Sequence, residues 1–361
     1  MKFIFFFLLL LLITEESFGF PQMIRHGYNR CTSCHVSPRG GGVLNDYGRV
    51  LSREVLSAWG YEGEEQWHFG AIKPNYEKES RVFVGGDFRA LQSYYNDKSV
   101  TQGRFIRMQE EIEVAGQWGD TKVAVRGGGD TTLESRPWYF NSYWVYQRML
   151  SSWTARLGRF TPRFGVNSPE HIFSTKGNLG FGYQSERDTF ELAYEQETWE
   201  VIASQSFGKN KAGEEMSATF LQANWLPSRK VQMGFNLQKE YKNDESQSFG
   251  FHSLLGFSER FYGMSEVIWS DRLIGGVREG GLYEFSKIGY ELAQGLHVIF
   301  IQDFNKKNFS RNGQSVTTIG GGFTIFPRPH FEFQAIWSQR KIEARGQEWA
   351  DFAWVMMHFY L

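Results

Sequence analysis

The residues best placed to do chemistry are two cysteines and a histidine in one short run, Cys31-Thr32-Ser33-Cys34-His35. The spacing C-x-x-C-H is that of a c-type haem attachment site, in which both thiols bond to one edge of a porphyrin. The histidine that follows then binds the iron as its proximal ligand. The pattern predicts one covalent haem c anchored by Cys31 and Cys34, with His35 as the metal ligand.

Other uses of a C-x-x-C pair are a disulfide, a thioredoxin-like redox pair and half of a zinc site. The chain has only 2 cysteines, so a zinc site would have no second pair of thiols. A thioredoxin-type pair opens a helix in a βαβ unit, whereas Asn29, Ser37, Pro38 and the glycines at 40–42 flank this one. A disulfide remains the alternative to haem.

The second axial ligand is not determined by the sequence. His26 lies five positions before Cys31 and is the first candidate for a distal ligand; His68 and Met23 are the other local choices. A five-coordinate iron also remains open.

The residues after the motif must position it. Three glycines at 40–42 favour a turn in which backbone passes close to a flat group or simply forms a loop. From Val43 to Trp59 the apolar residues recur at helical spacing, with Asn45 or Asp46 as the N-cap. The charged stretch from Tyr61 to Glu79 is typical of a linker or of a strap that docks on another unit.

The beginning of the chain has the form of a secretory signal. Lys2 precedes an unbroken apolar run from Phe3 to Ile13, and Ser17-Phe18-Gly19 has the small-x-small pattern of a cleavage site. The run is shorter than the roughly 20 residues that a membrane-spanning helix needs. We therefore expect a signal peptide at 1–19 and export from the cytoplasm. Export agrees with the haem motif, because bacteria attach haem c outside the cytoplasm.

Composition and periodicity indicate a β-barrel for most of the chain. Aromatic residues make up 17% of the 361 residues, with 39 Gly and only 9 Pro, and the net charge of −1 gives no reason to expect nucleic acid as a partner. From about Arg81 onwards apolar and polar residues alternate, as at 231–238 and 331–338. Ile106, Met108, Ile112 and Val114 alternate with charged or amide residues in the same way. Apolar-out, charged-in alternation over about 10 residues is the pattern of a transmembrane β-barrel.

We count sixteen strands in this region. They are expected at 81–95, 103–118, 121–129, 139–150, 153–162, 181–196, 199–208, 215–225, 230–240, 247–257, 260–271, 279–292, 295–305, 315–326, 330–341 and 348–361. Short links alternate with longer polar ones, and all the short links fall on the periplasmic side if the N-terminus is periplasmic. Aromatic residues near strand ends are expected to form an interfacial girdle; they include Trp118, Trp153, Trp199, Trp225, Tyr262, Trp269 and Trp349.

The longest interruption runs from Thr161 to Ser185. It either folds inward and narrows the lumen, so that Arg159, Arg163 and His171 present positive charge, or forms a plain outer loop. The barrel histidines at 252, 297, 330 and 358 are spread over different strands and suggest no metal cluster.

The run His26 to Arg49 resembles the N-terminal monohaem segment of a family of bacterial outer-membrane proteins that fuse a cytochrome c motif to a barrel. The segment 158–165 looks like one common in porin-type barrels. The resemblance implies 1–19 as signal peptide, 20–80 as a short, partly helical haem c segment with linker, and 81–361 as an all-β, transmembrane antiparallel barrel. By analogy it implies electron transfer at the outer membrane.

Three hypotheses follow. The first is electron transfer through one haem, with periplasmic electron carriers or cytochromes and the outer-membrane bilayer as partners, and with the haem below or inside the barrel. The second is a porin for small solutes whose haem segment is a plug or redox sensor. The third, a haem enzyme, needs a distal base of which the sequence shows no sign, so we expect a non-enzyme. The oligomeric state stays open.

Overall fold

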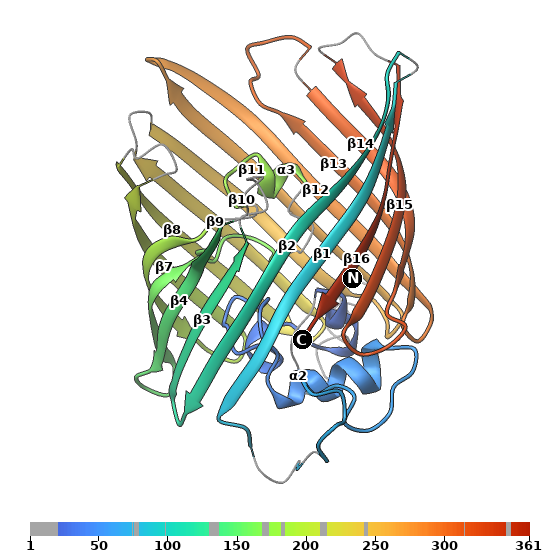
Figure 1. Ribbon diagram of the computed structural model, residues 1–361. Coiled ribbons are helices and arrows are strands. Elements are labelled where there is room, and N and C mark those ends of the chain that lie inside the picture. Colours follow the sequence, from blue (N-terminus) through green and yellow to red (C-terminus); the bar gives the residue numbers. More distant parts are fainter. Residues whose placement is uncertain are drawn as a thin grey trace, which may run out of the picture.

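The computed structural model describes residues 21–361 except 74, 76–78, 98, 130–136, 168–172, 182–184, 210–214, 242–244, 314 and 344–347. Sixteen antiparallel strands form one closed barrel in which each strand pairs with its sequence neighbours and β1 pairs with β16 (Figure 1). Closure leaves no unpaired sheet edge, as a membrane-spanning sheet requires. The predicted signal peptide at 1–19 lies outside the described residues.

The strands agree closely with the expected ranges, and the count of sixteen is confirmed. One prediction was wrong: the strand expected from 181 begins only at Arg187, because the chain before it folds into the lumen. The strands are β1 Val82–Asn96, β2 Thr101–Trp118, β3 Thr121–Gly129, β4 Trp138–Arg148, β5 Trp153–Phe160, β6 Arg187–Glu195, β7 Trp199–Lys209, β8 Glu215–Ser228, β9 Val231–Tyr241, β10 Glu245–Gly256, β11 Phe261–Ile274, β12 Val277–Ala293, β13 Leu296–Lys306, β14 Ser315–Ile325, β15 Phe331–Ile342 and β16 Ala350–Tyr360.

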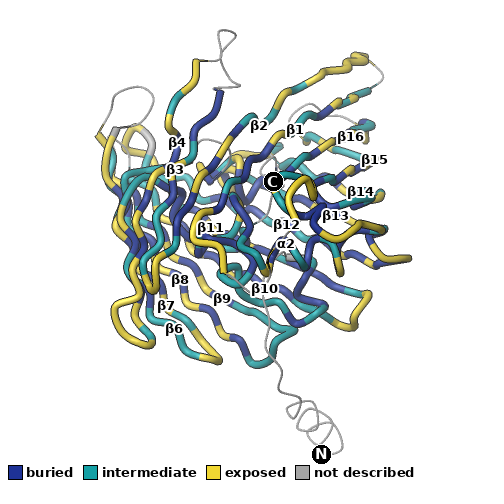
Figure 2. The backbone as a smooth tube through the Cα atoms, turned by 60° about the horizontal axis from the view of Figure 1, so that its bottom comes forward, coloured by how far each residue is buried: buried dark blue, intermediate teal, exposed yellow. Residues whose placement is uncertain are grey.

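The outer face of the barrel is apolar and the inner face polar, as the alternation predicted. Figure 2 shows exposed and buried residues alternating along the strands. Exposed apolar side chains include Val125, Val145, Leu157, Phe190, Val201, Leu221, Phe235, Phe249, Val267, Ile288, Phe300, Phe323, Phe333 and Val355. Buried polar ones include Glu113, Asn141, Arg156, Glu191, Gln222, Asn236, Glu266, Asp303, Gln334 and His358.

Two details of the expected pattern are corrected. The β1–β2 register shifts between Arg89 and Ala90, and this bulge reverses which residues of β2 face outward. Ile106 and Met108 therefore pack against an interior cluster, while Ile112 and Val114 stay exposed. Tyr262 also faces inward and is 2% exposed, so it does not join the girdle.

The residues before the barrel fold into its mouth. They form the turns and helices η2 (Pro21–His26), η3 (Cys31–Ser33), α2 (Asp46–Leu51) and η4 (Ser52–Leu56). Figure 1 shows this segment, in blue, at the end of the barrel where β1 begins and β16 ends. We call residues 22–60 the plug. No helix within the described residues is long and apolar enough to cross a membrane.

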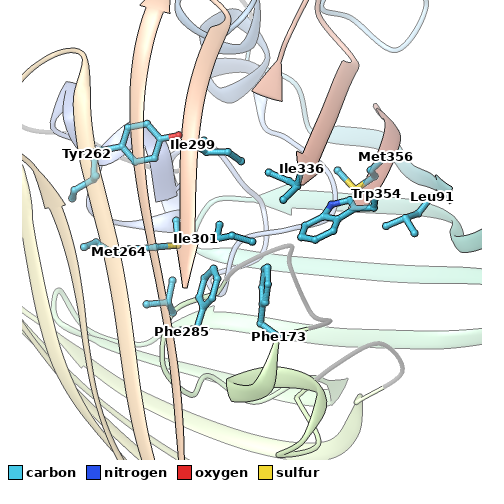
Figure 3. Packing of buried hydrophobic residues seen from close by; sticks show 13 residues of the cluster. Leu91, Phe173, Tyr262, Met264, Phe285, Ile299, Ile301, Ile336, Trp354 and Met356 are labelled. Carbon is cyan, nitrogen blue, oxygen red and sulfur yellow. The ribbon is translucent and has the colours of Figure 1, made fainter. Parts of the chain in front are cut away.

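Apolar contacts hold the plug on three sides of the lumen. Ile24 belongs to the largest cluster, with residues of β1, β10–β13, β15 and β16; Figure 3 shows barrel residues of this cluster. Val36 and Val43 pack against β1–β5. Leu51 and Leu56 pack against Phe326 and Tyr360. Burial of these side chains away from water is the main force that seats the plug.

A second segment, residues 161–167 and 173–181, folds into the lumen from the opposite end and carries the short helix α3 (Ser174–Gly177); we call it the inward segment. Phe173 stacks on Phe285 with centroids 4.3 Å apart (Figure 3). Ser174 Oγ donates to Asp303 at 2.7 Å. Lys176 Nζ lies 2.9 Å from Glu266. The inward alternative for this stretch is therefore confirmed.

Candidate functional site

The C-x-x-C-H run forms one tight turn. The backbone N–H groups of Cys34 and His35 both donate to the Cys31 carbonyl, at 3.3 and 3.0 Å. Asn45 ties this turn to the next helix: its Nδ2 donates to the Ser33 carbonyl at 2.7 Å, and its Oδ1 accepts from Gly48 N at 2.8 Å. Asn45 is thus the N-cap of α2, as predicted, although the helix is shorter than the expected span.

The glycines at 40–42 all have positive φ, from 64° to 82°, a region that suits glycine. The close neighbours of Gly40 and Gly42 are side-chain atoms of the protein itself. A Cβ at Gly40 would lie 3.0 Å from Cys31 Sγ, and one at Gly42 would overlap the Glu113 carboxylate. The run therefore lets the plug backbone pass between its own motif and the barrel wall.

A cavity of about 250 Å³ lies between the motif and the wall. Cys31 and His35 both line it, and so do residues of β1, β2, β7, β8 and β16. Its arginine and carboxylate lining residues are Arg30, Arg39, Asp87, Arg89, Glu111, Arg126, Arg163, Glu186, Glu195 and Glu200, and His358 lines it as well. The cavity is the candidate site, because it brings Cys31 and His35 of the C-x-x-C-H run to a charged lumen.

Cys31 and Cys34 form no disulfide with each other. Burial raises the pKa of Cys31 to about 11 and that of Cys34 to about 12. Both are therefore protonated at neutral pH, unlike the low-pKa thiol of a thioredoxin-type pair. Cys34 packs with Met23 and Leu44 in a buried cluster rather than lining the cavity.

His35 is 4% exposed, and burial lowers its pKa to about 4. Its imidazole is therefore neutral at pH 7, the form that binds metal ions. Among the described residues no group of three or more His, Cys, Asp or Glu side chains is arranged to hold a metal ion.

The arginines of the cavity differ in their partners. Arg126 pairs with Glu186 at 2.8 Å, Arg163 with Glu191 at 3.2 Å, and Arg30 donates to backbone carbonyls of the β6–β7 turn. Arg39 makes no side-chain hydrogen bond or ion pair within the described part of the chain. Burial lowers its pKa to about 10, while the nearby carboxylate of Glu186 acts in the opposite direction. This cation therefore lies in the cavity near carboxylates but forms an ion pair with none of the described ones.

The other candidate ligands lie elsewhere. His26 ends η2 beside Arg25 and Glu291 and does not line the cavity. Met23 is buried in the cluster around Cys34. His68 lies beyond the plug, its ring 5.4 Å from that of Trp67. The distal ligand stays a prediction.

A buried triad at the cavity wall has no signal in the sequence. His358 Nε2 lies 2.9 Å from Asp87 and its Nδ1 lies 2.9 Å from Glu332. These residues come from β16, β1 and β15, so only barrel closure brings them together. Arg159 pairs with Asp188 at 3.4 Å and is partly exposed; His171 lies outside the described residues.

The barrel resembles solved bacterial outer-membrane channels. An anion-selective porin from Comamonas acidovorans matches with a TM-score of 0.61 at 10% identity, over 78% of this chain and 100% of the porin. The outer membrane channel DcaP of Acinetobacter baumannii matches with 0.57 at 12%, over 78% and 97%. OprB of Pseudomonas putida matches with 0.57 at 9%, over 78% and 94%.

No family model and no curated protein matches this sequence. At 9–12% identity the structural likeness establishes the fold alone. The chain has the closed sixteen-stranded, porin-like fold of outer-membrane channels.

Proposed function

We propose that this protein is an outer-membrane channel for small solutes whose periplasmic mouth is closed by the plug. The observation that carries the proposal is the fastening of the plug to successive turns of one rim. Asn29 Nδ2 donates to the Ser228 carbonyl at 3.2 Å, and Gln294 Nε2 donates to the Ser57 carbonyl at 2.8 Å. Ala58 N donates to the Phe326 carbonyl at 2.8 Å.

A buried ion pair also joins the plug to the rim. Arg25, 0% exposed, pairs with Glu291 of β12 and donates to the Glu259 carbonyl at 2.8 Å. Separating the plug from the rim would leave each of the two charges without its partner. This costs free energy unless water reaches the charges. Solute passage therefore needs the plug to loosen, and the charged lumen favours polar solutes.

The test is ion conductance in planar bilayers, with and without moderate urea. We expect the parent protein to be nearly silent without urea. It should conduct once urea frees the plug, as judged by proteolysis of the plug while the barrel stays folded. Steady porin-like conductance without urea would overturn the proposal, and so would silence after the plug has become cleavable.

A second candidate function, electron transfer through one haem c, is favoured by the position of Cys31 and His35 on one cavity. The residues fit the group in three respects: two protonated thiols that form no disulfide lie in one turn, a neutral imidazole follows them, and Arg39 makes no side-chain ion pair within the described residues. In this proposal 20–80 forms the haem segment and linker, and 81–361 the barrel.

Cys31 and Cys34 would hold the porphyrin and His35 the iron; bound haem would supply reversible one-electron chemistry. Arg39 would pair with a propionate, and the buried surroundings would keep water from His35. One site cannot lie near both faces of a hydrocarbon layer about 30 Å thick. The exchange partners are therefore carriers on the plug side.

The test is the pyridine haemochrome spectrum of protein purified from outer membranes of a host that attaches haem c. We expect a covalent-haem spectrum in the parent and none in a Cys31→Ala/Cys34→Ala variant. A parent without haem would refute this second function and leave the channel proposal standing.

A further inference from the structure

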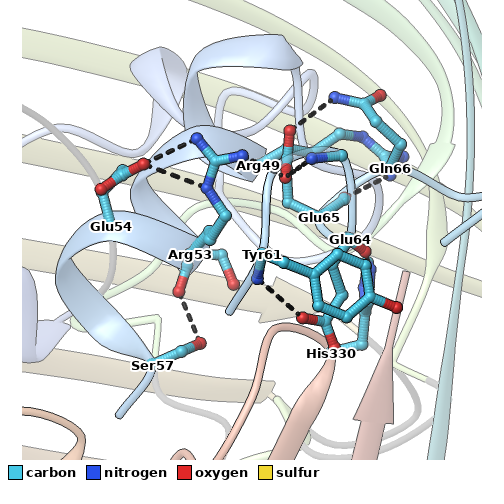
Figure 4. Close-up of polar contacts among 11 residues, drawn as sticks. Arg49, Arg53, Glu54, Ser57, Tyr61, Glu64, Glu65, Gln66 and His330 are labelled. Atoms are coloured by element: carbon cyan, nitrogen blue, oxygen red, sulfur yellow. Dashed lines mark hydrogen bonds and ion pairs between the residues drawn. The ribbon is translucent and has the colours of Figure 1, made fainter. Parts of the chain in front are cut away.

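The chain leaves the plug across the rim of the barrel in residues 61–73, which we call the strap. The β14–β15 turn holds its first half. His330 Nε2 lies 2.8 Å from the Glu64 carbonyl, and Arg328 Nε donates to Glu64 at 2.6 Å. Arg328 also lies over the Tyr61 ring, 5.1 Å from its centroid. Figure 4 shows Tyr61, Glu64 and His330 together at this crossing.

Large apolar side chains are exposed from Trp59, near the end of the plug, through the strap. The exposed fractions are 60% for Trp59, 56% for Tyr61, 51% for Trp67, 42% for Phe69 and 60% for Ile72. Five such residues within fourteen positions form an apolar patch of the kind that marks an interaction surface.

The patch is continuous with the lipid-facing surface of the barrel. The Phe69 ring stacks on Phe359 of β16, with centroids 6.1 Å apart and an interplanar angle of 18°. Phe359 in turn contacts Phe331 at 5.2 Å and Phe88 at 6.1 Å. Phe88, Phe331 and Phe359 point outward. On β16, Phe359 lies between His358 and Tyr360, whose side chains point inward.

We propose that the strap is an interfacial membrane anchor: Trp67, Phe69 and Ile72 lie among the headgroups of the leaflet on the plug side. Tryptophan and tyrosine prefer that depth, because one end of each ring is apolar and the other polar. A lipid occupant is favoured over a protein because Phe69 extends a surface that already faces lipid. The adjacent Lys73 is exposed and suits anionic headgroups.

This inference does not rest on the channel or on haem. It has a mechanical consequence: the plug is held at its far end by lipid as well as by the rim. The plug can therefore loosen without being lost from the mouth.

The test uses a fluorescent probe, NBD, on Trp67→Cys or Ile72→Cys in full-length protein reconstituted into phospholipid vesicles. Glu62→Cys, an exposed strap position that carries a charged and not an apolar side chain, is the matched control. Parent protein treated identically measures labelling of the buried native cysteines. Lipids with a headgroup nitroxide should quench the probe at 67 and 72 several-fold more than at 62.

Equal quenching at the three positions would overturn the anchor. So would a probe at 67 shielded from both lipid nitroxide and aqueous iodide, since that result indicates a protein partner. Adding Phe69→Asn to Ile72→Cys should lower quenching at least twofold, because asparagine accepts the φ of 53° at this position but removes the stacked ring. Unchanged quenching there would count against the proposal, provided that gel mobility shows a folded barrel.

Discussion

Replacing Arg25 by Met tests how the plug is held. The guanidinium is completely buried and paired with Glu291, whose side chain is 10% exposed. Removing one partner of a buried pair leaves the other charge uncompensated and costs about 3–5 kcal/mol. Because the pair joins plug to barrel, this loss falls on docking of the plug and not on the strand ladder. The undocked fraction should rise by on the order of a hundredfold or more.

The assay is the open probability in planar bilayers, with protease cleavage of the plug as a second readout. The double variant Arg25→Met/Glu291→Met should recover much of the closure, because two apolar side chains replace a buried ion pair at little net cost. Arg278→Met is the control. It breaks a 2.7 Å pair with Asp271 at the other end of the barrel, where Arg278 is 68% exposed, and should change little.

Two results would refute this reasoning. One is an Arg25→Met protein as silent and as protease-resistant as the parent. The other is a double variant as leaky as the single one, which would mean that the loss comes from packing rather than from the stranded carboxylate.

Further predictions concern the glycine turn, acid and the inward segment. Gly42→Ala forces a side chain into a left-handed backbone and against Glu113; it should weaken docking by at least about 1–2 kcal/mol, seen as faster plug proteolysis. Burial and the neighbouring Arg25 lower the pKa of His26 to about 4, so undocked His26 binds protons more tightly than docked His26. Docking should be strongest above pH 6.5 and weaken as the pH falls towards 4, and His26→Gln should flatten this pH dependence of conductance. Lys176→Met leaves Glu266, which is 1% exposed, without its ion-pair partner. The free energy of unfolding, measured by thermal unfolding followed by circular dichroism, should fall by about 3–5 kcal/mol. An unchanged melting temperature would contradict the pairing.

Much of the barrel is determined by the sequence alone. Strand positions follow from alternation and turn residues, which act over a few neighbouring residues, so β3 begins and ends at the predicted positions. The cap at Asn45 is equally local. The departures are non-local: a bulge reverses the face of Ile106, and the late start of β6 depends on contacts of the inward segment across the lumen.

The tertiary structure alone decides where the plug lies and what surrounds its motif. Cys31, Cys34 and His35 are evident from spacing, but their cavity is completed by strands distant in sequence. His358 meets Asp87 across 271 residues, and Arg25 meets Glu291 across 266. Such pairs form only when β16 closes on β1 and the plug enters the mouth. Local pattern carries no information about that closure, because alternation specifies which face a residue occupies and not which distant residue it meets.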